Sequence, residues 1–123
     1  MSNAIRWVKS DGNVQTDGAS LVAGTYYGEI SVDMAAGFAV DVVCDATAVA
    51  TITIEGTVRG SSLATHTAVG TGWTALPSLG SVAPAASATS FLFEVSGANC
   101  PRYRLKNVVG TGGVITAQYQ VKG

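Results

Sequence analysis

The chain has 123 residues, of which 73 are Gly, Ala, Ser, Thr or Val, and only 12% are charged. Seven Lys and Arg residues against eight Asp and Glu residues leave a net charge of −1, which argues against general nucleic-acid binding, because such binding needs clustered cations to neutralise phosphates. Thirty residues are Leu, Ile, Val or Phe, enough apolar surface for one core, so the composition also excludes a disordered chain.

Apolar and polar residues alternate along most of the chain, as in half-buried β-strands, and no window repeats every 3.6 residues as a helix would. A first short strand is expected at 4–9, and a second at 26–34, which places Ile30, Val32 and Met34 inward. Further strands are expected at 38–45, 49–59, 73–76, 91–96, 102–109 and 115–122.

Two of these strands show the alternation with charged residues on the outward side. In 49–59 the inward residues are Ala50, Ile52, Ile54 and Val58, and the outward ones include Glu55 and Arg59. In 102–109 the inward residues are Tyr103 and Leu105, and the outward ones are Arg102, Arg104 and Lys106.

Turn-forming residues separate the strands. The run Gly110–Gly113 predicts a hairpin between the last two strands, because glycine supplies the positive φ that tight hairpins require. Residues 61–72 are expected to form an exposed loop, and 78–89 an extended surface segment. About eight short strands at this spacing predict an all-β chain forming a single antiparallel β-sandwich, jelly-roll-like, over residues 1–123, with residues 1–25 as an N-terminal arm or edge strand.

The sequence shows no catalytic or metal-binding pattern. His66 is the single histidine, and neither a nucleophile elbow nor a nearby carboxylate accompanies it. Cys44 and Cys100 lie 56 positions apart, so free thiols are favoured over a disulfide, which stays open as the alternative. We therefore expect neither enzymatic activity nor a cofactor. No apolar run is long enough to span a bilayer, so membrane insertion is not expected. No leader-like segment follows the first residues, so we expect synthesis in the cytoplasm.

The candidate contact residues are cations and tryptophans. Arg102, Arg104 and Lys106 form the one basic cluster, and Arg59 is a candidate fourth member. The cluster serves either solubility or docking to an acidic protein surface through bidentate Arg–carboxylate pairs. Trp7 and Trp73 are further interface candidates. As an alternative, Trp7, Trp73 and Tyr27 would form a sugar-stacking platform if exposed.

Residues 38–122 contain an ordered series of features. The series comprises Ile52-Thr-Ile-Glu-Gly56, Gly60-Ser61, Trp73-Thr-Ala-Leu76, Arg102-Tyr-Arg-Leu105, Gly110–Gly113 and the alternating strand Val114–Val121. This series resembles the small β-sandwich structural proteins of tailed bacteriophages. The loop between Gly60 and Trp73 is longer here than in that pattern, where a short Asp-Gly turn is usual.

The resemblance implies a capsid decoration (cement) protein, or a head or tail attachment module. Its expected partner is the major capsid protein, which it would bind at the outer surface of the virion as a homo-oligomer, a trimer being favoured, so as to bridge coat subunits and stabilise the head. A carbohydrate-binding or attachment module of a phage fibre or tail is the alternative.

Overall fold

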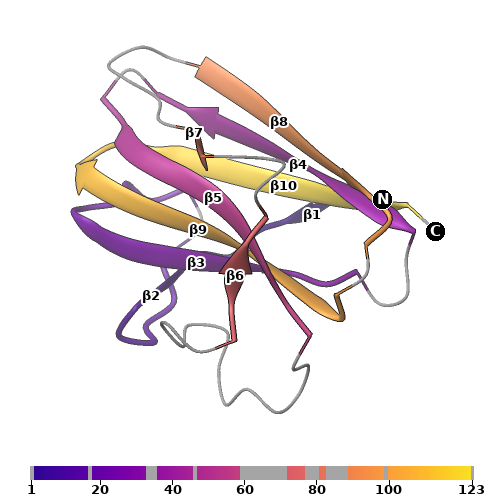
Figure 1. Cartoon of the computed structure of the whole chain (residues 1–123). Coiled ribbons are helices and arrows are strands. Elements are labelled where there is room, and N and C mark those ends of the chain that lie inside the picture. The colour runs from indigo at the N-terminus through magenta and orange to yellow at the C-terminus, as the bar shows by residue number, and fades with distance from the viewer. Residues whose placement is uncertain are drawn as a thin grey trace.

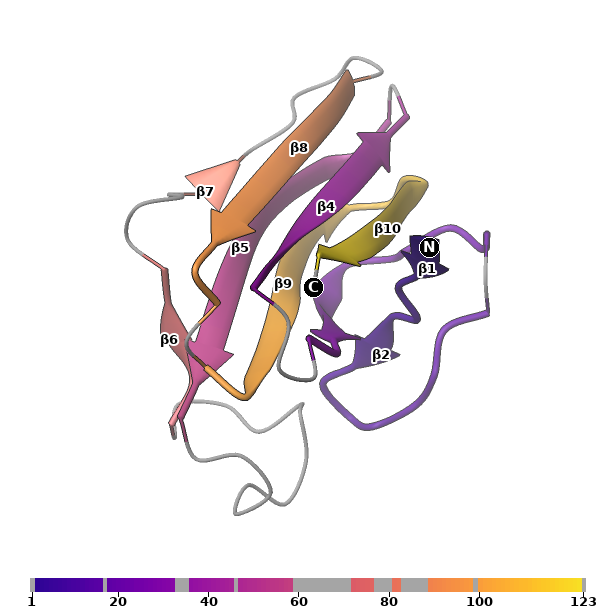
Figure 2. The same ribbon diagram turned by 90° about the vertical axis from the view of Figure 1, so that its right-hand side faces the viewer.

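The computed structural model shows two antiparallel β-sheets packed face to face (Figures 1 and 2). It describes residues 2–16, 18–32, 36–45, 47–58, 72–76, 81–82, 89–98 and 100–122. One sheet has the strand order β1-β10-β4-β8, and the other has the order β2-β3-β9-β5-β6, with β7 also paired to β5. The strands are β1 (Ser2–Ala4), β2 (Val8–Lys9), β3 (Gly24–Ile30), β4 (Gly37–Cys44), β5 (Val49–Thr57), β6 (Thr74–Ala75), β7 (Ser81–Val82), β8 (Thr89–Ser96), β9 (Arg102–Thr111) and β10 (Ile115–Lys122). The predicted antiparallel sandwich is confirmed.

The core lies between the sheets and is made by the inward residues of each alternating strand. In β3, β4, β5, β8, β9 and β10 the alternate residues that face inward are buried or partly buried, so the predicted alternation is confirmed. Side chains two apart on a strand point to the same face. The fully covered ones include Ile30, Val40, Val42, Ile52, Ile54 and Leu105. Val58 is a wrong prediction: it lies just beyond the end of β5 and is 79% exposed.

The N-terminal segment forms two short strands instead of the single one predicted at 4–9. β1 pairs with β10 at the edge of the four-stranded sheet, whereas β2 pairs with β3 at the edge of the six-stranded sheet. The residues between them cross from one sheet to the other, which carries Ile5 and Trp7 into the core. This segment therefore closes one side of the sandwich.

The predicted hairpin at Gly110–Gly113 is wrong, because β9 and β10 belong to different sheets. Gly113 serves close packing instead of a tight turn, since a Cβ on it would collide with the backbone of Ala48. Two backbone hydrogen bonds between Leu21 and Gly113 hold this crossover. Asp45 fixes it from the other side, because its Oδ2 accepts a hydrogen bond from the Val114 amide.

Several predicted features lie outside the described residues, namely Met34, Arg59, His66 and most of the 61–72 and 78–89 segments. The described residues contain no helix that is long and apolar enough to cross a membrane.

Candidate functional site

Arg104 lies on the outward side of β9, as the alternation predicts, but it is only 1% exposed. Its neighbours Tyr103 and Leu105 point into the core, so Arg104 emerges on the opposite face of the six-stranded sheet. The expectation that Arg104 is a solvent-facing docking cation is wrong, because Tyr27, Glu55 and Trp73 pack around it. We call these four residues the Arg104 cluster.

The Arg104 cluster combines an ion pair with two aromatic contacts. Arg104 Nε donates a 2.6 Å hydrogen bond to Oε1 of Glu55, which occupies the directly opposite position on β5. The guanidinium carbon lies 4.2 Å from the ring centroid of Tyr27 on β3 and 4.4 Å from that of Trp73, which precedes β6. Because β9 runs between β3 and β5, the two rings approach Arg104 from opposite sides.

This environment suits structural stabilisation better than recognition. Glu55 is only 9% exposed, and removal of both charged groups from water is offset by their mutual hydrogen bond. Burial is the main cause that raises the pKa of the Tyr27 hydroxyl above its ordinary value of 10.0, while the Arg104 charge opposes that shift. The contacts of the Arg104 cluster thus hold Trp73 against the outer face of the six-stranded sheet.

The other predicted contact residues have different environments. Trp7 belongs to the hydrophobic core at 6% exposure, and Trp73 is 8% exposed, so neither is an accessible anchor. Arg102 remains partly exposed, 3.4 Å from Glu29 and 5.6 Å from the Trp73 ring, and Lys106 is half-buried. The interface role of Arg59 stays a prediction.

No described segment covers the outward side of β10, β4 and β8, and we call it the open face. Its side chains are mostly small or uncharged, and its charged residues are Asp41, Glu94 and Lys122. Val43 on β4 and Leu92 on β8 are 46% and 62% exposed and are diagonal neighbours across the strand pair, because Leu92 lies opposite Asp41 and Val43 opposite Ser90. They form an apolar patch beside the polar part of the open face.

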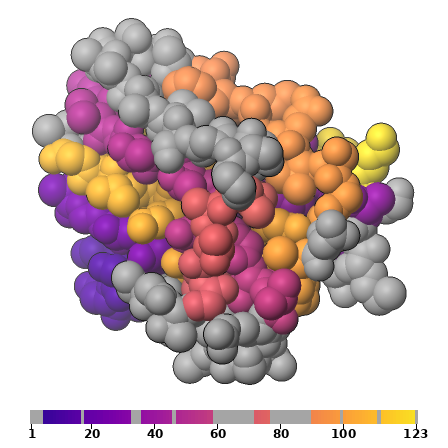
Figure 3. All heavy atoms as spheres, in the orientation of Figure 1, coloured from indigo at the N-terminus to yellow at the C-terminus, as the bar shows by residue number. Residues whose placement is uncertain are grey.

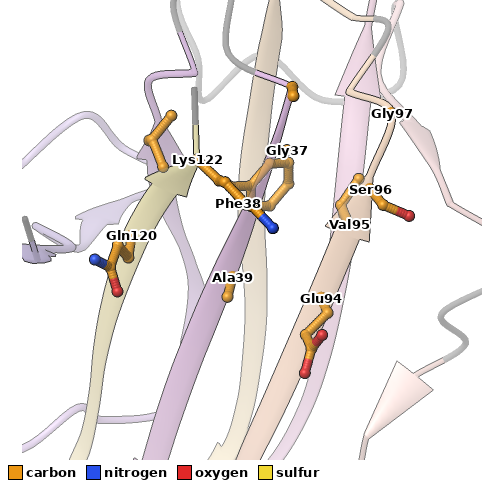
Figure 4. A pocket seen from close by; sticks show the side chains of 11 residues that line it. Gly37, Phe38, Ala39, Glu94, Val95, Ser96, Gly97, Gln120 and Lys122 are labelled. Atoms are coloured by element: carbon orange, nitrogen blue, oxygen red, sulfur yellow. The ribbon is translucent and has the colours of Figure 1, made fainter.

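A hollow of about 540 Å³ lies at one end of the open face (Figure 4). Gly37 and Ala39 of the middle strand β4 belong to its lining. Gly37 also lets β8 approach closely, because a Cβ on it would collide with the Val95 carbonyl oxygen. Gln120 and Glu94 flank Ala39, in one row of the register. The next row places Lys122 and Ser96 on either side of Gly37.

The hollow offers hydrogen-bonding and charged groups without a catalytic arrangement. Glu94 and Gln120 stand two strand spacings apart, roughly 9–10 Å, and Glu94 is the one carboxylate of the lining. In the part of the chain that the structure describes, no three His, Cys, Asp or Glu side chains gather as a metal site. Cys44 is buried and Cys100 partly buried, and both thiols are free.

Alternation within the strands expected at 91–96 and 115–122 points Glu94, Ser96, Gln120 and Lys122 outward but does not bring them together. Their proximity depends on the pairing of β4 with both β8 and β10, which alternation within one strand does not reveal. The signal that was available is the pair of small residues Gly37 and Ala39 at outward positions of an otherwise bulky strand.

No family model matches this chain, and no curated protein matches it. One similar solved structure is described as "CBM4 structure and function", a carbohydrate-binding module with 12% sequence identity and a TM-score of 0.48. That alignment covers 98% of this chain and 77% of the other.

Proposed function

We propose that this chain is a non-catalytic structural protein that attaches to a larger protein assembly through the open face. The observation that carries this proposal is a contrast between the two sheets. No described segment covers the weakly charged outer side of the four-stranded sheet, where Val43 and Leu92 are exposed, whereas on the other sheet Trp73 lies over Arg104. Protein interfaces are depleted of charge at their centres and depend on a few apolar anchors.

The assembly that we propose is a tailed-bacteriophage head, with the major capsid protein as partner, because residues 38–122 resemble phage structural sandwiches. The chain would bind the outer capsid surface as a homo-oligomer, bridge neighbouring coat subunits and so oppose internal pressure. The location on the virion and the trimer implied by the resemblance belong to this same proposal.

The carbohydrate-binding alternative has less support from the residues themselves. Every Trp, Tyr and Phe of the chain lies in the described part, and none is exposed. The predicted platform of Trp7, Trp73 and Tyr27 is buried. A sugar ring therefore finds no aromatic surface on which to stack in this conformation.

Co-sedimentation with undecorated capsids of the encoding phage tests the proposal. We expect the parent chain to bind saturably, and Val43→Lys to weaken capsid binding at least tenfold, because it places a charge in the apolar patch. Val108→Lys is the matched control, since Val108 is 41% exposed on the other sheet, and it should bind like the parent. No binding by the parent chain, or equal binding by both variants, would contradict the proposal.

A further inference from the structure

β8 is a long edge strand with one side unpaired among the described residues. All eight of its residues, Thr89–Ser96, pair with β4, and the sheet order ends there. Figures 1 and 2 show no described strand of that sheet beyond it. Every second residue of such an edge directs its N–H and C=O groups outward, where another strand can pair with them.

This edge lacks the features that usually prevent strand pairing. The segment 89–96 contains no Pro and no Lys, and Glu94 is its one charged residue. Leu92 is 62% exposed, an unusual feature for a free edge. β1, at the opposite edge of the same sheet, has three residues, and β2, at an edge of the six-stranded sheet, has two. Edges that short offer little pairing surface.

We propose that two copies of this chain pair through their β8 strands, antiparallel and related by a twofold axis, so that the two four-stranded sheets become one continuous sheet. The proposed register places Leu92 opposite Leu92 of the second copy. Ser90 then lies opposite Glu94, and Phe91 opposite Phe93, so outward residues meet outward residues and core-facing rings meet core-facing rings.

Side-chain chemistry selects both this register and a second copy as the occupant. A register centred on Glu94 would place two carboxylates opposite each other, and one centred on Phe93 would place Glu94 opposite Leu92. Centring on Leu92 avoids both and covers the exposed apolar side chain. The strand is therefore complementary to itself, which is the requirement of a twofold interface.

This pairing goes beyond attachment to a capsid and does not depend on it. An edge that pairs with itself closes after two copies, so the interaction gives a dimer, or a larger assembly built from dimers. The trimer proposed above forms on the capsid surface through a different contact, so the chain free of capsid is expected to be dimeric.

Native mass spectrometry and sedimentation velocity at micromolar concentration test the pairing without any capsid. We expect the parent chain to be dimeric, and Leu92→Lys to weaken dimerisation at least tenfold while the far-ultraviolet circular dichroism stays unchanged, because Leu92 is exposed in the single chain. Val43→Lys is the matched control, with the same change on the same face but one strand inward, and it should remain dimeric.

Oxidative cross-linking tests the register. Residues directly opposite each other in an antiparallel pair are close enough for a disulfide. Leu92→Cys should therefore give a covalent dimer under mild oxidation, whereas Val43→Cys and the parent chain should not. A monomeric or trimeric parent, a dimer insensitive to Leu92→Lys, or one lost in Val43→Lys alone would overturn the proposal. If β8 pairs only with a strand of another protein, the purified parent chain will be monomeric, which contradicts the proposal.

Discussion

The outer faces of the two sheets carry the same kind of alternating sequence but differ in what lies over them. On the six-stranded sheet, Trp73 lies over Arg104, and Glu55 Oε1 accepts a 2.6 Å hydrogen bond from that arginine (Figure 3 shows the β6 segment next to β5). On the four-stranded sheet, Gly37 and Ala39 leave a hollow, and Leu92 faces solvent. An outward position is therefore a binding position only where no other segment covers it.

Replacement of Glu55 is expected to have the largest effect on stability. Glu55→Ala leaves the Arg104 charge buried without its carboxylate and should lower the free energy of unfolding by about 3–5 kcal/mol. Urea denaturation followed by circular dichroism measures this. Glu94→Ala on the open face is the control, and it should change stability by less than about 0.5 kcal/mol. A similar loss of unfolding free energy in both variants would contradict the proposed difference between the two outer faces.

A double-mutant cycle measures the contact between Trp73 and Arg104. Trp73→Ala and Arg104→Met are each expected to destabilise the fold, and together they should lose less than the sum. The coupling expected for a desolvated cation–π contact is about 1–2 kcal/mol. A coupling near zero would mean that Trp73 covers the sheet without stabilising the arginine.

A third carboxylate, outside both faces, sharpens the contrast between buried and exposed acids. Asp45 Oδ1 accepts hydrogen bonds of 2.9 Å from the Thr47 amide and hydroxyl, and these bonds hold the pKa of Asp45 below its ordinary value of 3.8. A lowered folded-state pKa gives stability that is fully present above the unfolded value and is lost as the pH falls through the folded one.

Asp45→Asn should therefore reduce the loss of stability below about pH 4, without changing its pH dependence between pH 6 and 8. Thermal unfolding at pH 2.5, 3.5, 4.5 and 7 checks this. A parent and variant that lose stability in parallel through the acid range would contradict the assignment. Because the group is exposed, we expect this effect to be the smallest of the three.

The sequence predicted which residues alternate but not which strands become neighbours. Local alternation sufficed for Val40, Ile54 and Ala117, because burial on one face imposes a period of two. It failed at Gly110–Gly113, where a change of sheet and a hairpin share the same turn residues. It also failed at Arg104, because the covering Trp73 lies 31 positions away in the chain and nothing within β9 reports its presence.

Hydroxyl-radical footprinting of the free and capsid-bound protein tests the central claim, that the open face and not the face of the Arg104 cluster makes the attachment. We expect Val43 and Gln120 to lose reactivity when bound, while Val108 and Lys106 stay as reactive as in the free chain. Protection of Val108 and Lys106 with an unchanged open face would contradict the account.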